Sequence, residues 1–166
     1  MAGYRCPCDQ CMNRSGLATQ GSEYVDVSGE PLDAQLLLDF VSDPAAGAAV
    51  MFSGTVRNHS RGREGVTHLE YEAYEGVVVT KIAQVVATAR SRWPIIKVAA
   101  VHRTGTLNVG EPAVMVAVST AHRADAFPAC KFVIDELKRS VPIWKKEHWP
   151  GGAEWVREDL HHASDS

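Results

Sequence analysis

The sequence predicts an α+β fold in which two main helices pack on one face of a largely antiparallel sheet. Strand-like and helical patterns follow one another in the order β-α-β-β-α-β along the chain. Two stretches of about 20 residues carry apolar side chains three or four positions apart, the spacing of one helix face. The chain has 166 residues, of which 45% are hydrophobic and 22% charged, so it is long enough to form one domain with a buried core.

The first half of the chain predicts one short helix and one pair of strands. Residues 31–42 carry apolar side chains at helical spacing, and Pro31 suits the first turn of a helix. Residues 48–58 form an apolar, β-prone run, and residues 66–74 alternate apolar and polar side chains. We expect these two runs to pair as antiparallel strands. The glycine-containing segment 59–65 between them is typical of an exposed, flexible connection.

A longer helix and a strand hairpin are expected next. Residues 75–93 have apolar side chains every three or four positions, and Pro94 ends the pattern. Residues 95–107 and 113–121 are two β-rich runs. The segment between them, Asn-Val-Gly-Glu-Pro at residues 108–112, has the composition of a hairpin turn, so it is expected to join the two strands.

The second main helix is expected over about residues 122–140, followed by a closing stretch from Pro142 to Val156. Pro128 lies near the first turns of this helix, where it removes a backbone donor and can distort the geometry. The apolar side chains expected to reach the core are Phe127, Phe132, Ile134 and Leu137.

Both ends of the chain are predicted to lie outside the domain, which spans residues 23–157. Residues 1–22 lack periodicity and are interpreted as a disordered extension, and residues 158–166 as a polar tail. The extension carries three closely spaced thiols, Cys6, Cys8 and Cys11. Such thiols can begin a zinc site, but the usual second pair of ligands is absent. We favour reduced thiols in a mobile segment, with zinc binding as the alternative.

Charge and hydropathy exclude several classes of protein. The 17 lysines and arginines against 20 acidic residues give a net charge of −3 and a pI near 6.1, which argues against a general nucleic-acid-binding domain. No apolar run approaches the roughly 20 residues of a membrane-spanning helix, and the N-terminus lacks the pattern of a secretory signal. We expect a cytoplasmic protein without membrane contact, whose positive sites bind a small anion.

One stretch, LKRSVPIWKKEH at residues 137–148, gathers four lysines and arginines around an apolar centre. Pro142 disfavours helical geometry in the residue before it, so Lys138 is expected to end a helix and Lys145 to begin an extended segment. The two amines can converge across that corner. Trp144 can desolvate Lys145 and make its amine a nucleophile or proton carrier. The alternatives are a lysine that complements the helix dipole and a lysine stem that lies over a core tryptophan.

Further cations are expected where strands end. His122 and Arg123 fall where a strand passes into a helix N-terminus, which presents free backbone N–H groups to an anion. Arg57 ends another strand beside Gly54, which permits close approach of a ligand. Together with the lysines these residues could line one phosphate-binding pocket. Taken singly, each of these cations is better explained as a surface charge. The segment 102–105 could add to the pocket, but a strand-end turn explains it as well.

Five stretches of the sequence occur in a characteristic order and spacing: FSGTVRNH, LEYEAYEG, RWPIIKVAAVHRTGTLNVGE, VAVSTAHRADAF and DELKRSVPIWKKE. Together they resemble the family of the large, catalytic subunit of molybdopterin synthase, over about residues 24–157. The resemblance implies a domain that contains an α/β-hammerhead, with no resident cofactor and no metal at its site. The chain differs from the family in two places. It has an N-terminal extension that carries cysteines, and it has Pro128 within a helix where the family more often has a helix-forming residue.

The activity implied by the resemblance is that of a sulfurtransferase in molybdenum cofactor biosynthesis. Such an enzyme inserts two sulfur atoms into cyclic pyranopterin monophosphate to form the dithiolene of molybdopterin. The sulfur arrives as a thiocarboxylate at the C-terminal Gly-Gly of a small ubiquitin-like subunit. The large subunits form a homodimer at the centre of a heterotetramer, and each receives the tail of one small subunit.

The resemblance also implies the roles of individual residues. The family's essential lysine matches Lys138 and its second active-site lysine matches Lys145. Its substrate-contacting positions fall on Thr55, Val56, Arg57, His122, Arg123, Lys138, Lys145, Lys146 and Glu147. Lysines at a thiocarboxylate supply positive charge to a developing oxyanion and can move protons.

Two other classes of protein stay open at this point. The first is a non-catalytic module that docks a ubiquitin-like protein but has lost sulfur transfer, and the presence of both lysines argues against it. The second is a zinc-binding regulatory protein built around the three N-terminal cysteines. Activity of a Lys138→Ala variant distinguishes the first, and metal analysis with and without residues 1–20 distinguishes the second.

Overall fold

The computed structural model describes residues 19–60 and 62–156, and its largest element is a five-stranded sheet. The strands lie in the order β1-β2-β7-β9-β3, and all neighbours are antiparallel except β2 and β7. Their bounds are Thr19–Gln20 for β1, Glu23–Ser28 for β2, Ile95–Arg103 for β7, Pro112–Thr120 for β9 and Ala48–Thr55 for β3.

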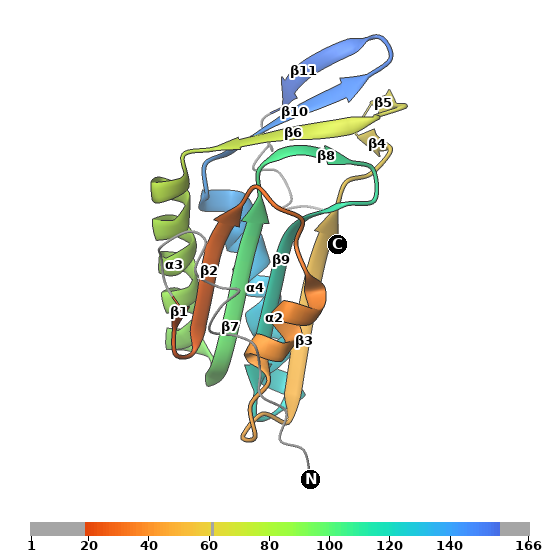
Figure 1. The fold of residues 1–166 in the computed structure, drawn as a ribbon. Coiled ribbons are helices and arrows are strands. Elements are labelled where there is room, and N and C mark those ends of the chain that lie inside the picture. Colours follow the sequence, from red (N-terminus) through yellow and green to blue (C-terminus); the bar gives the residue numbers. More distant parts are fainter. Residues whose placement is uncertain (1–18, 61, 157–166) are drawn as a thin grey trace.

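Helices cover both faces of this sheet (Figure 1). Helices α3 (Glu75–Arg92) and α4 (Arg123–Ser140) pack together on one face, over a core of buried valines, alanines and isoleucines. The short helix α2 (Ala34–Val41) packs on the other face through Leu37 and Val41. It begins at Asp33, whose carboxylate accepts hydrogen bonds from the first free N–H groups of the helix. No helix of the described residues is long and apolar enough to span a membrane.

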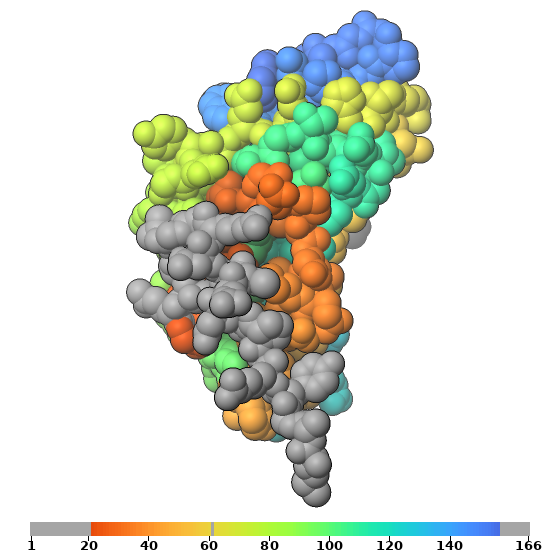
Figure 2. Space-filling view, in the orientation of Figure 1, coloured from red at the N-terminus to blue at the C-terminus, as the bar shows by residue number. Residues whose placement is uncertain are grey.

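A four-stranded antiparallel sheet lies across one end of the first, and the space-filling view shows it as one end of the molecule (Figure 2). Its strands lie in the order β11-β10-β6-β8. They are Gly152–Val156 for β11, Ile143–Trp149 for β10, His68–Ala73 for β6 and Gly105–Asn108 for β8. A small separate core of Val56, Val66, Leu69, Leu107 and Ala113 lies on the inner side of this sheet. Two short strands, β4 (His59–Ser60) and β5 (Arg63–Glu64), form a hairpin beside it.

The structure confirms the α+β class and the two helices on one face, but it corrects the expected strand pairing. The runs at residues 48–58 and 66–74 do not pair, because β3 pairs with β9 in one sheet and β6 pairs with β8 and β10 in the other. The run at 95–107 is divided at Gly105, whose φ of 87° turns the chain from the first sheet into the second.

Two further differences concern the edges of the predicted domain. Strand β2 was not predicted from the sequence. In the structure β2 lies parallel to β7, and its Val25 and Val27 side chains are buried in the core. The expected disordered extension, residues 1–22, overlaps the pairing of Thr19 and Gln20 with β2, so the sheet begins earlier than predicted. The three N-terminal cysteines and the tail at 158–166 lie outside the described residues.

Helix α4 extends unbroken through Pro128. The buried side chains of α4 include Val133, Ile134 and Leu137. Of these, Ile134 and Leu137 were predicted to reach the core. Phe127 is 62% exposed, and its prediction as a core residue is wrong because it follows buried Ala126 around the helix onto the outer side.

Candidate active site

A pocket of about 830 Å³ lies where the two sheets and the end of α4 meet. Its described lining includes side chains from β3, β6, β7, β9 and β10, from the β4–β5 hairpin and from the last turn of α4. Four of the lining residues are basic, Arg57, Lys138, Arg139 and Lys145, and one is acidic, Glu147. In a chain with a net charge of −3, this local excess of positive charge is chemically suited to an anion.

The corner between α4 and β10 positions the two lysines. Lys138 lies in the last turn of α4, and Lys145 is the third residue of β10. Between them Val141 has extended geometry, with φ of −90° and ψ of 124°, as expected for a residue before Pro142. The helix ends at this corner as the sequence predicts, and both lysines are among the residues that line the pocket.

Lys145 is largely buried because its side chain lies on the inner face of the four-stranded sheet, toward the pocket. Its side chain is 17% exposed and lines the pocket. Trp144 is its neighbour on the strand, so the two side chains leave opposite faces of the sheet, and Trp144 is 52% exposed. Both residues are nevertheless among those that line the pocket.

Glu147 is the acidic centre of the site, and it is only 3% exposed. Its Oε2 atom accepts hydrogen bonds from Ser60 Oγ at 2.6 Å and Arg63 Nη1 at 3.0 Å, while its Oε1 atom lies 3.5 Å from Lys145 Nζ. Burial opposes ionisation of this carboxyl, but the Ser60 hydrogen bond and the charges of Lys145 and Arg63 outweigh it and hold the pKa of Glu147 below its usual value. The carboxylate therefore links β10 to the β4–β5 hairpin in its charged form.

The segment after β3 contributes to the pocket in part. Thr55 and Arg57 line it, whereas Val56 between them is buried in the small core and donates its N–H to the Glu111 carbonyl. Gly54 also lines the pocket, but its neighbours explain the glycine, because a Cβ atom there would lie 2.8 Å from Cγ1 of Val114.

The other predicted contacts lie elsewhere on this chain. His122 and Arg123 are at the N-terminus of α4, and 15 residues of helix, about 22 Å, separate Arg123 from Lys138. Lys146 lies on the outer face of the four-stranded sheet, 3.8 Å from Glu70 and over the ring of Trp155. These three residues are not among those that line the pocket.

Sequence reasoning missed Tyr71, which lines the pocket, and Arg63, which contacts Glu147 from beside it. Tyr71 and His102 face each other with ring centroids 5.1 Å apart, and both line the pocket. His102 Nδ1 lies 2.8 Å from the Arg103 carbonyl, which only accepts, so Nδ1 carries a proton. His102 belongs to the segment 102–105, which was a candidate for the pocket, but Arg63 gave no signal because the glycine-containing segment around it resembles an ordinary loop.

Within the described ranges 19–60 and 62–156, no group of three or more histidine, cysteine or acidic side chains is placed to hold a metal ion. The described cysteine, Cys130, is buried in the main core, which raises the pKa of its thiol to about 11 and makes it unreactive. Among the described lining residues, the groups available for chemistry include Lys138, Lys145, two arginines and two histidines.

The fold and the pocket define an α+β protein with a cationic pocket suited to a small anion. The chain belongs to the MoaE protein family, whose model matches residues 27–140. The resemblance of the five sequence stretches is thereby confirmed, and so is the α+β fold class.

Relatives and solved structures agree with the family. A molybdopterin synthase catalytic subunit of Arabidopsis thaliana is 49% identical over 127 residues, which cover 76% of this chain and 64% of the plant protein. A protein of the same description from Halalkalibacterium halodurans is 43% identical over 135 residues, 81% of this chain and 86% of that protein. The crystal structure of molybdopterin synthase from Staphylococcus aureus superposes with a TM-score of 0.75 at 38% identity, over 80% of this chain and 96% of that chain.

Proposed function

We propose that this chain is the catalytic subunit of a molybdopterin synthase. In this function it transfers sulfur from the C-terminal thiocarboxylate of a small ubiquitin-like subunit to cyclic pyranopterin monophosphate and so forms the dithiolene of molybdopterin. The observation that carries the proposal is the meeting of Arg57, Lys138 and Lys145 in one pocket, because the substrate, the sulfur donor and the reaction intermediate are all anionic.

The chemistry assigns a separate role to each cation. The thiocarboxylate sulfur attacks an electrophilic carbon of the pterin side chain and forms a C–S bond. The C–O bond at that carbon breaks, and its oxygen leaves either as water or on the phosphate, which gives a thioester. Water then adds to the thioester carbonyl. The tetrahedral oxyanion collapses with cleavage of the C–S bond, which leaves the sulfur on the pterin and a carboxylate on the small subunit. Lys138 is assigned to stabilise the oxyanion and move protons, Lys145 to hold the substrate and intermediate, and Arg57 to bind the phosphate.

The positions of His122 and Arg123 support a dimer in which each copy completes the other's pocket. Strand β3 is the edge of its sheet, and it extends from the end near His122 to Thr55 at the pocket. A two-fold axis across this edge would place the N-terminus of one α4 beside the pocket of the second copy. Phe52 on β3 and Phe127 on α4 are exposed along this side and would be covered.

The small subunit is proposed to place its Gly-Gly tail in the pocket between the two sheets. The described lining combines apolar residues such as Val66 and Leu69 with the cations, which suits an extended peptide tail that ends in an anion. We also propose that the reaction takes place in the cytoplasm, where the reduced thiol of Cys130 and the thiocarboxylate would both persist.

Reconstitution tests the proposed function. The full chain is mixed with a thiocarboxylated small protein that ends in Gly-Gly and with cyclic pyranopterin monophosphate, and dithiolene product is measured by fluorescence of its oxidised derivative. The account predicts two sulfur atoms transferred for each pterin. Binding of the small protein without any sulfur transfer would leave only a docking function and would overturn the proposal.

A further inference from the structure

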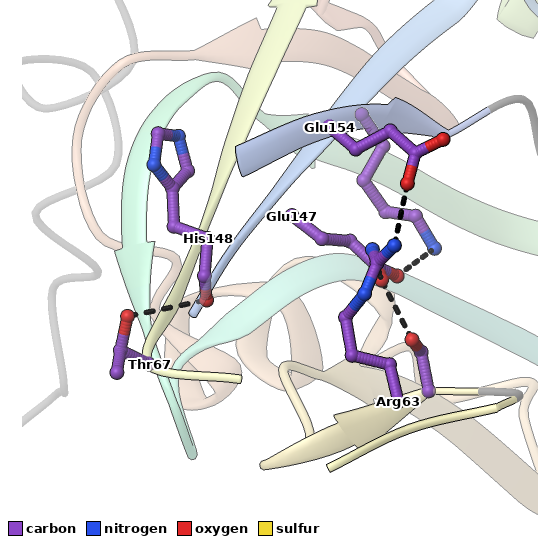
Figure 3. A network of polar contacts seen from close by, with 7 residues as sticks. Arg63, Thr67, Glu147, His148 and Glu154 are labelled. Carbon is purple, nitrogen blue, oxygen red and sulfur yellow. Dashed lines mark hydrogen bonds and ion pairs between the residues drawn. The ribbon is translucent and has the colours of Figure 1, made fainter. Parts of the chain in front are cut away.

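Arg63 lies outside the set of residues expected at the site, yet it contacts the site's acidic centre (Figure 3). It begins β5, in the hairpin whose other strand supplies His59 and Ser60 to the pocket wall. Its guanidinium lies 3.8 Å from the centre of the Trp149 ring and donates to the carboxylates of Glu147 and Glu154. A planar cation that binds two carboxylates and lies on an aromatic ring is a fixed charge rather than a mobile surface group.

The two oxygens of Glu147 point to different partners. Oε2 is held by Ser60 and Arg63, both from the hairpin, and Oε1 faces the ammonium group of Lys145. Glu147 and Lys145 lie two residues apart on β10, so their side chains share the inner face of the sheet. The Glu147 carboxylate thus lies between two cations, Arg63 at one oxygen and Lys145 at the other.

Charge balance decides what Arg63 does in this arrangement. A buried carboxylate with a single cationic partner holds that partner tightly, because the low local dielectric strengthens their attraction. A second cation on the far oxygen neutralises the carboxylate and weakens its hold on the first. With Arg63 in place, Glu147 can orient Lys145 while the Lys145 ammonium group stays available to an anionic ligand.

We propose that Arg63 is a positioning residue for sulfur transfer, which acts through Glu147 to keep Lys145 available to the pterin substrate. This inference rests on the proposed function of the pocket. The simpler role would be mechanical, in which Arg63 only anchors the β4–β5 hairpin to β10 and β11. The two roles differ in what happens when Glu147 loses its charge.

The test measures the dissociation constant of cyclic pyranopterin monophosphate for the full chain by titration calorimetry. Arg63→Gln is expected to weaken binding by roughly tenfold, because Glu147 then draws Lys145 to itself. The double variant Arg63→Gln with Glu147→Gln is expected to recover most of that loss. Glu154→Gln is the matched control, since Glu154 also binds Arg63 but is 62% exposed on β11, and it is expected to stay within about twofold of the wild type.

Each outcome decides between the roles. Recovery in the double variant supports the charge-balancing role, whereas a double variant as weak as or weaker than Arg63→Gln would overturn it in favour of a mechanical anchor. Unchanged binding by Arg63→Gln would also overturn it. If Arg63→Gln does not fold, Arg63→Met replaces it in the same cycle. Failure of the wild-type chain to bind the pterin would instead count against the proposed function itself.

Discussion

Lys138 and Lys145 line the same pocket although one lies in the last turn of α4 and the other on β10. The corner that joins these elements is fixed by Pro142 and by the extended geometry of Val141. Both amines are therefore placed by the backbone before any ligand binds. Preorganised charge of this kind stabilises a developing oxyanion without the cost of moving the charges during the reaction.

Replacement of adjacent lysines on β10 tests which face of the sheet is the active face. Lys145→Ala is expected to lower the rate of sulfur transfer by about 100-fold, because it removes a cation from the pocket. Lys146→Ala is the matched control on the outer face and is expected to stay within about threefold of the wild type. Both are measured with saturating small subunit. An equal loss in the two variants would contradict the assignment of the inner face.

Mixed dimers test whether each copy completes the other's pocket. Arg123→Ala and Lys138→Ala chains are each expected to be nearly inactive alone. When the two are co-expressed, half of the dimers combine them, and each mixed dimer has one intact pocket, so about a quarter of wild-type activity should return. Activity no higher than that of the separate variants would mean that His122 and Arg123 do not act across the dimer.

Acid sensitivity tests the charged state of Glu147. Its pKa is lower in the folded chain than its ordinary value of 4.5, so its charge stabilises the fold above that pH and the contribution is lost as pH falls through the lower folded value. Urea unfolding of the wild type and Glu147→Gln between about pH 3 and pH 7 measures it. The difference in unfolding free energy between the two chains should shrink toward pH 3. A difference that stays constant with pH would show that Glu147 does not contribute through its charge.

The contribution of the small core under the four-stranded sheet to the free energy of unfolding can be tested by mutation. Leu107 on β8 is fully buried in the small core that includes Val56 and Leu69. Leu107→Ala is expected to lower the free energy of unfolding by about 2–5 kcal/mol and to reduce sulfur transfer, because the second sheet supports the pocket. Val109→Ala in the adjacent turn is the control, since Val109 is 43% exposed, and a change within about 0.5 kcal/mol is expected. Equal losses in the two variants would contradict a separate core under the second sheet.

The sequence predicts local features of this fold better than its long-range pairings. Helix ends, the corner at Pro142 and the strand-to-helix junction at His122 follow from residue chemistry within a few positions, and the structure confirms them. The partner of each strand depends on contacts between distant segments, and periodicity carries no information on these. That is why β3 was assigned to β6 instead of β9, and why β2 was missed.

The candidate site shows the same division. Arg57, Lys138 and Lys145 are cations in distinctive local settings, so the sequence identifies them and the structure brings them together. Arg63 reaches Glu147 only because the hairpin folds against β10, 84 residues away in sequence. Arg123 lies at the start of α4 and the pocket lies at its end. The sequence alone does not show that these two ends lie at different places relative to the pocket.

The central claim is that Lys138 carries sulfur transfer, and single-turnover kinetics test it most directly. Thiocarboxylated small subunit and pterin are mixed with Lys138→Ala or with Lys131→Ala, a control on the same helix whose 76% exposed side chain pairs with Asp135. We predict that Lys138→Ala slows transfer by at least about 1,000-fold with unchanged binding of the small subunit, whereas Lys131→Ala reacts at the wild-type rate. Transfer by Lys138→Ala at the wild-type rate would contradict the account.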